Sequence, residues 1–264
     1  MKKNFPVELV YQVFSLLIAF ILVHALYVTV IRPQASSFLE QEAANMQANP
    51  DYEPQRSFFV VIKDYEQETC FVLMLWAFAI LGFKGKTTYN QQKLLEQDML
   101  RLPDDLPIGA EDTRDLAARL RALPDTVHEY LLPRALLTAI ERFGATRNVQ
   151  DVSTAARDIC ESEGERMESE LSIIRYIAWA IPSVGFIGTV RGIGDALGQA
   201  HRAVEGDITG VTSSLGVAFN STFIALVISI VLMFFIHQLQ LMQERLVLDS
   251  ERYIDHWFIR RLRT

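Results

Sequence analysis

Two hydroxyl side chains lie within otherwise apolar stretches, where they could handle protons. Thr189 is in the stretch 173–193 and Thr222 is in the stretch 215–236. A hydroxyl both donates and accepts hydrogen bonds, so it can pass a proton along or hold a water beside a carboxylate. The purely structural alternative is a hydrogen bond from each hydroxyl to the carbonyl four residues earlier in its own helix. Spacing alone leaves both uses open.

The two threonines are expected to lie at similar depth in a membrane. Thr189 is six residues before Asp195, near the outer end of one predicted helix, and Thr222 is nine residues after Ser213, near the outer end of the next. At about 1.5 Å per residue, these separations correspond to depths of about 9 and 13 Å. The two hydroxyls could therefore share one layer.

Three further polar residues are candidates for the same region. Asn220 could line the threonine face or hold neighbouring subunits together through its amide. Arg191 is predicted to pair with Asp195, one turn later. The functional alternative for Arg191 is a charged gate or a contact with a partner at the outer mouth.

Small residues and a proline mark the first of the two stretches. Gly185, Gly188 and Gly192 recur at spacings of three and four, which places them on one face of a helix. Such a face lets helices approach closely, as a tight ring of subunits requires. Pro182 lies in the same stretch, three residues before Gly185.

The elements that position these residues are predicted from four apolar windows. A helix needs about 20 such residues to cross a hydrocarbon core of about 30 Å. The fold class is therefore an all-α membrane protein with four transmembrane helices and long helices that project into the cytoplasm. The expected order is a cytoplasmic N-terminus (1–8), transmembrane helix 1 (9–31), a periplasmic segment (32–66), transmembrane helix 2 (67–85), a cytoplasmic helical domain (86–170), transmembrane helix 3 (171–195), a periplasmic loop (196–212), transmembrane helix 4 (213–237) and a cytoplasmic helical tail (238–264).

The orientation follows from the positions of lysine and arginine, which favour the cytoplasmic side. Residues 84–170 hold twelve of them, whereas residues 32–68 hold three beside seven acids. Both termini are therefore expected in the cytoplasm. The first apolar run is longer than a signal core and offers no small-residue cleavage site, so we expect it to remain as a helix.

Two helices should extend well beyond the membrane. One begins near residue 151, with Asp151 or Ser153 as its cap, and runs into transmembrane helix 3. The other, from about residue 213 to 262, would be about 75 Å long. His24, alone in the first apolar run, is interpreted as a neutral side chain that reaches the outer interface rather than as a proton relay.

Composition excludes several function classes. The net charge of −7, with no basic stripe, argues against a nucleic-acid partner. The histidines show no paired metal-ligand spacing, and no nucleophile motif accompanies them, so we predict neither an enzyme nor a cofactor or metal site. The chain has no phosphate-binding loop, so an ion gradient rather than ATP would supply energy.

Two motifs carry a resemblance to a known family. Residues 182–193, PSVGFIGTVRGI, contain a Gly-x-x-Gly-Thr-Val-x-Gly run, and residues 220–226, NSTFIAL, contain Thr-x-x-Ala-Leu. Together and in this order, on successive membrane helices, they resemble the proton channel family of TolQ, ExbB and MotA. The shared order of cytoplasmic segment, helix, outer loop, helix and tail extends the resemblance to about the last two thirds of the chain.

The resemblance implies a ring-forming oligomer in a bacterial inner membrane. In that family, five copies surround the paired membrane helices of a second, single-span protein of TolR, ExbD or MotB type. An aspartate of that partner carries protons, with H⁺ preferred to Na⁺ as the coupling ion here, and proton flow turns the dimer relative to the ring. By position, Thr189 and Thr222 match pore-facing hydroxyls, and Pro182 matches a proline of the kinked helix. Where ExbB has a glutamate, this chain has Val217, so either a partner supplies the acid or the chain does not conduct.

Other functions remain open at this point. The helix pair could belong to a membrane scaffold that does not conduct, in which case loss of the two hydroxyls would have no effect. Within the family, the extra first span and the cytoplasmic N-terminus are closer to MotA, whereas the threonines follow TolQ and ExbB. An ion-driven stator or an anti-phage motor of ZorA type is therefore a further alternative. The sequence does not indicate which process the motor would drive.

Overall fold

The computed structural model describes residues 7–49, 52, 55, 57–100 and 107–263. Within these residues the fold is helical, apart from one isolated parallel bridge between Ile108 and Leu262. In this described part of the chain, four helical segments are long and apolar enough to cross a membrane: 8–48, 65–95, 149–198 and 209–261. The predicted fold class, all-α with four such helices, is confirmed in this respect.

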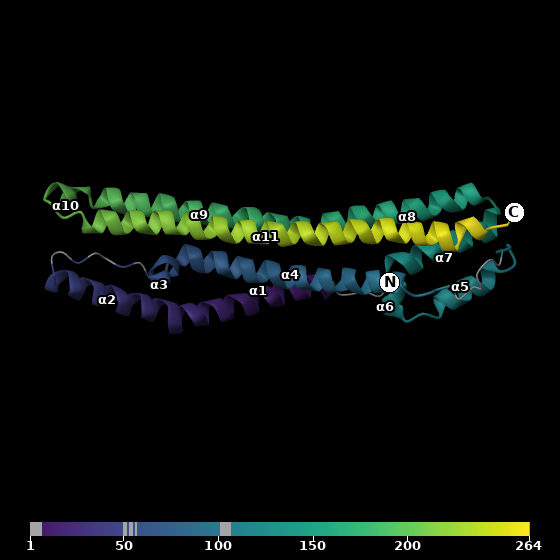
Figure 1. The fold of residues 1–264 in the computed structure, drawn as a ribbon, viewed down its shortest axis with the longest axis horizontal. Helices are drawn as coiled ribbons and strands as arrows, with labels where there is room; N and C mark the ends of the chain where they lie inside the picture. Colours follow the sequence, from purple (N-terminus) through teal and green to yellow (C-terminus); the bar gives the residue numbers. More distant parts are fainter. Residues whose placement is uncertain (1–6, 50–51, 53–54, 56, 101–106, 264) are drawn as a thin grey trace. The chain divides into compact units, whose positions relative to one another are not determined.

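The helices are α1 (Val7–Leu26), the π-helical turn η1 (Tyr27–Ile31), α2 (Arg32–Ala48), α3 (Phe58–Ile62), α4 (Tyr65–Leu95), α5 (Thr113–Arg121), α6 (Asp125–His128), α7 (Leu131–Thr146), α8 (Val149–Glu170), α9 (Ser172–Gly198), α10 (Ala200–Val204), α11 (Thr209–Trp257) and the 3₁₀ turn η2 (Ile259–Arg261) (Figure 1). They form two compact units. Unit 1 contains residues 1–81 and 173–236, and unit 2 contains residues 82–172 and 237–264.

In unit 1, α1 packs along the first part of α4 through bonds to main-chain carbonyls. The Tyr11 hydroxyl donates to the carbonyl of Ala79 at 3.0 Å, and the indole of Trp76 donates to the carbonyl of Gln12 at 2.9 Å. Both donors belong to amphipathic aromatic side chains, whose rings fill apolar space while the polar atom finds a partner. The outward side of α1 exposes large apolar residues, as a lipid-facing surface would.

The first apolar helix continues further than the sequence predicts. The π-helical turn η1 joins α1 directly to α2, so the helical path runs to Ala48 rather than ending near Ile31. Pro33 does not stop it, because it occupies the first turn of α2, where the missing N–H is tolerated. The second apolar helix also begins earlier than its apolar core, at Tyr65, and therefore includes Glu66 and Glu68.

The two long helices are present with small changes at their ends. The cap of α8 is Asn148, whose side chain accepts from the Gln150 amide at 2.9 Å; the predicted caps Asp151 and Ser153 are wrong and lie inside the helix. Only Leu171 separates α8 from α9. The last helix, α11, has 49 residues, which corresponds to about 74 Å.

Unit 2 has its own hydrophobic core. Leucines at helical spacing on α5 and α7, including Leu120 and Leu136, pack with Phe143, and the same core takes in Ile254 and Phe258 from the chain's end. Leu136 and Phe143 are fully buried. A separate apolar core explains why these residues form a unit of their own.

Candidate functional site

Thr189 of α9 and Thr222 of α11 meet inside unit 1, with their hydroxyl oxygens 2.5 Å apart. The Thr189 hydroxyl is also within donating distance of the carbonyl of Ala218, at 3.0 Å, and the Thr222 hydroxyl is within donating distance of the carbonyl of Gly185, at 3.1 Å. Each hydroxyl has one proton, so the pair makes two of these three bonds at a time. Ala218 lies four residues before Thr222, and Gly185 lies four residues before Thr189. Each threonine therefore uses the carbonyl that the other would use for a bond within its own helix.

This crossed arrangement differs from the simple back-bonding alternative. The distance from the Thr189 hydroxyl to the carbonyl of its own helix, at Gly185, is 3.5 Å, longer than its 3.0 Å bond to α11. Each hydroxyl has one proton and two lone pairs, so the pair keeps acceptor capacity for a further donor. Both side chains are only partly buried. A hydroxyl pair of this kind can hold a water or exchange a proton with an acid that approaches from its open side.

The glycine face of α9 lies against small residues of α11 within the same chain. A Cβ atom at Gly185 would be 2.5 Å from the Cβ of Ala225, and one at Gly188 would be 2.5 Å from the Cβ of Ser221. At Gly192 it would be 2.7 Å from the carbonyl oxygen of Ser214. These distances are too short for any side chain. The close approach that the spacing predicts therefore joins the two helices that carry the threonines.

Arg191 does not pair with Asp195. Its Nε and Nη2 donate to the two carboxylate oxygens of Glu66, on the first turn of α4, each at 2.8 Å. The sequence prediction failed because the apolar core of the second span begins after Glu66, which placed that acid in an outer loop. Asp195 is exposed and forms no ion pair within the described residues.

The same turn of α4 carries a buried amide that contacts α11. Gln67 is fully buried, and its Nε2 donates to the carbonyl of Val61 at 3.1 Å and to the Ser221 hydroxyl at 3.4 Å. Its Oε1 and the Oδ2 of nearby Asp64 are buried acceptors with no donor in the described part of the chain. Burial raises the pKa of the Asp64 carboxyl, opposed by the nearby cations Lys63 and Arg191.

His24 has a carboxylate partner that the sequence did not indicate. Its Nδ1 lies 2.7 Å from Oε1 of Glu68, whose other oxygen pairs with Arg32. Glu68 is 6 % exposed, and Arg32 stacks on the ring of Tyr65, with its guanidinium carbon 4.4 Å from the ring centre. A buried carboxylate needs such partners, because an unpaired charge is costly away from water. This cluster ties α1 and α2 to α4.

The remaining predicted residues are placed as follows. Asn220 is partly buried and has no hydrogen-bond partner for its amide among the residues that the structure describes. Pro182 lies inside α9, which runs from Ser172 to Gly198. The Ser229 hydroxyl donates to the carbonyl of Ala178 near this proline. The sequence analysis did not single out Ser229, although its position seven residues after Thr222 is a signal that could have found it.

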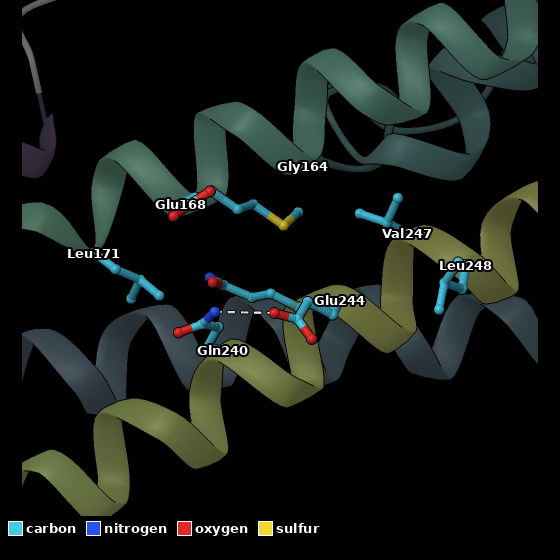
Figure 2. Close-up of a pocket in the computed structure, with 9 residues that line it drawn as sticks. Gly164, Glu168, Leu171, Gln240, Glu244, Val247 and Leu248 are labelled. Atoms are coloured by element: carbon cyan, nitrogen blue, oxygen red, sulfur yellow. Dashed lines mark hydrogen bonds between the residues drawn. The ribbon is translucent and has the colours of Figure 1, made fainter.

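A groove of about 340 Å³ lies in unit 2 between α8 and α11 (Figure 2). Leu171 and Val247 contribute apolar side chains to it, and Glu168 and Glu244 face it from the two helices. The amide of Gln240 donates to Glu244 at 3.0 Å. The groove is mainly apolar with an acidic border, and no sequence motif indicated it.

Part of the chain matches a known protein family. Residues 128–252 match the MotA/TolQ/ExbB proton channel family, and this range contains the threonines, the glycine face, Pro182 and Arg191. No curated protein and no solved structure matched the chain. The family is non-enzymatic and consists of channel subunits of energy-transducing membrane complexes. With its four apolar helices, this chain is a multi-pass membrane protein that carries a MotA/TolQ/ExbB proton channel domain at residues 128–252.

Proposed function

We propose that this chain is the proton-conducting subunit of a rotary complex that uses the proton motive force to move a partner dimer. The observation that carries the proposal is the crossed hydroxyl pair of Thr189 and Thr222. It places two groups that donate and accept protons in one layer of the helix pair, partly open to an incoming acid. The family match over residues 128–252 supports the same role.

The acid is proposed to come from a partner. In the stretch 173–236, the only carboxylates are Asp195, Glu205 and Asp207, which lie at the outer end or in the outer loop. The carboxylates of α4 near this layer, Glu66 and Glu68, are each held in ion pairs, so we propose that the mobile proton carrier belongs to another chain. We propose a single-span protein of TolR, ExbD or MotB type with a membrane aspartate, held inside a ring of five copies of this chain.

The energy that one proton supplies is of the size that a small mechanical step needs. One proton that moves through a potential of 100 mV supplies about 2.3 kcal/mol. This is enough to bias movement between nearly equivalent positions of a ring, but a larger step would need several protons. We place the complex in a bacterial inner membrane, with both termini of this chain in the cytoplasm because the lysines and arginines concentrate in residues 84–170 and 238–264.

Proton flux through reconstituted vesicles tests the proposal. The chain is purified with its single-span partner, and flux is measured with a pH-sensitive dye under an imposed potential. Thr189→Val and Thr222→Val keep the side-chain shape but remove the hydroxyl, so we expect flux to fall at least tenfold, and further in the double variant. Thr189→Ser and Thr222→Ser are the matched controls, because they keep the hydroxyl and should retain most of the flux.

The same experiment separates conduction from a scaffold role. A sizing column first verifies that every variant assembles with the partner as the wild type does. The hydroxyl bonds also join α9 to α11, so a scaffold would lose stability in the valine variants without any flux to lose. Absence of flux in the wild-type complex, or equal flux in the valine variants, would overturn the channel proposal. A stator or an anti-phage motor would conduct as well, so the partner's identity distinguishes these processes.

A further inference from the structure

Pro182 leaves one main-chain carbonyl of α9 without its usual donor. In an α-helix the N–H of residue 182 would bind the carbonyl of Ala178, but proline has no N–H. In hydrocarbon no water replaces a missing donor, and an unsatisfied carbonyl is costly. In this chain, the Ser229 hydroxyl of α11 donates to the Ala178 carbonyl at 3.1 Å.

Ser229 continues the hydrogen-bond pattern of the threonine pair. Thr222 donates to Gly185 at 3.1 Å, and Ser229 donates to Ala178 at 3.1 Å. The two donors are seven residues apart on α11, and the two acceptors are seven residues apart on α9. Because seven residues are close to two helical turns, both bonds lie on the same side of this helix pair. These two interhelical hydrogen bonds restrict how far α9 can slide or rotate relative to α11.

A donor from a third helix lies beside the proline. The thiol of Cys70 on α4 points to the carbonyl of Ile181, with 3.7 Å between sulfur and oxygen, and Cys70 is fully buried. A thiol is a weak donor, so this contact adds little energy. It shows that α4 and α11 both approach the main chain of α9 at the proline. Ala178, whose carbonyl is the acceptor, is buried, whereas Pro182 and Ser229 are partly buried.

We propose that Ser229 is a positioning residue for the proton path, in which its hydroxyl takes the place of the N–H that Pro182 lacks and holds the Thr189–Thr222 pair in register. The bond from Ser229 to Ala178 differs from the bond from Thr222 to Gly185 in whether its acceptor has another donor. Gly185 has the N–H of Thr189 available within α9, whereas Ala178 has no such donor from residue 182. Ser229 is therefore needed because of the proline.

A double-mutant cycle on the full-length chain tests this dependence without any functional assumption. Ser229→Ala is made in the wild type and in Pro182→Ala, and the apparent Tm of each purified protein is measured in the same detergent at one scan rate. In the wild type we expect Ser229→Ala to lower Tm by about 2–4 °C, since a buried acceptor loses its donor. With Pro182→Ala, residue 182 supplies the N–H, so the same substitution should have almost no effect. Equal losses in both backgrounds would overturn the proposal.

A matched pair of variants keeps the test valid if Pro182→Ala does not fold. Ser229→Thr retains the hydroxyl and Ser229→Val has nearly the same shape without it. We expect Ser229→Thr to have the wild-type Tm and Ser229→Val to match Ser229→Ala. Similar behaviour of the threonine and valine variants would show that the hydroxyl is not the relevant group.

The positioning role also predicts an effect on conduction, and this part depends on the proposed function. In the vesicle assay, Ser229→Val should reduce flux about threefold or more, and Ser229→Thr should restore it. If the effect of Ser229→Ala on Tm does not depend on Pro182, the role of Ser229 is contradicted, whether or not the chain conducts. Intact coupling with no flux in the wild type contradicts the channel proposal instead. Intact coupling with unchanged flux in Ser229→Val would limit Ser229 to helix packing and overturn the positioning role.

Discussion

Arg191 of α9 and Glu66 of α4 form a two-bond ion pair between residues 125 positions apart in the sequence, with both nitrogen–oxygen distances at 2.8 Å. The planar guanidinium matches the carboxylate in this geometry, which fixes the orientation of both side chains. The Glu66 side chain also passes over Gly188, where a Cβ would be 3.1 Å from its Cγ. The first turn of α4 is thereby tied to the C-terminal part of α9, the helix that carries Thr189.

The ion pair predicts a specific coupling in stability. The Arg191 side chain is 43 % exposed and that of Glu66 is 11 % exposed, so solvent screening limits the coupling to about 1 kcal/mol. We expect a double-mutant cycle of Arg191→Met with Glu66→Gln to give this value at low salt and less at high salt. The same cycle with Asp195→Asn is the control and should give no coupling. A larger coupling to Asp195 would contradict the structure.

The glycine face predicts opposite effects for two neighbouring glycines of α9. Gly192→Ala places a methyl group 2.7 Å from a main-chain oxygen of α11, so we expect a loss of about 1–3 kcal/mol. Gly194→Ala has no atom within 4 Å of the new methyl group and should be neutral or gain up to about 1 kcal/mol of helix propensity. Unfolding of both purified variants measures the difference. Equal stability of the two would show that α9 and α11 are not in close contact.

The partly buried carboxyl of Asp64 predicts a pH dependence of stability. Its pKa is raised by burial, so the folded state favours the protonated form. Stability from this group is fully present below the unfolded pKa, about 3.9, and is lost as pH rises through the higher folded pKa. Asp64→Asn cannot ionise, so we expect the variant to gain stability relative to the wild type as pH rises from 4.

The measurement is unfolding of both proteins between pH 4 and pH 8. The other charged groups near Asp64, namely Lys63, Glu66, Arg32 and Arg191, are present in both proteins, so their direct contributions largely cancel in the difference. A difference that stays constant over this range, or that favours the wild type at higher pH, would contradict the raised pKa.

Local sequence patterns were sufficient to predict the four long helices and the small-residue face of α9. Apolar windows depend only on the residues within them, so four long helices could be predicted before any contact was known. The spacing of Gly185, Gly188 and Gly192 similarly determined one small-residue face, since helical geometry repeats every 3.6 residues. The sequence could not say whether that face meets another subunit or α11 of the same chain, because spacing carries no information about the partner.

The contacts between distant residues were decided by the tertiary structure. The prediction that Arg191 pairs with Asp195 assumed the neighbour in sequence. Folding instead brings the more buried carboxylate of Glu66 to Arg191, where it accepts two bonds from the guanidinium, whereas Asp195 stays exposed. Likewise, the sequence was compatible with a hydrogen bond from Thr189 and from Thr222 to a carbonyl of its own helix. Only the close packing of α9 and α11, which the missing Cβ atoms permit, let each hydroxyl reach the carbonyl of the other helix.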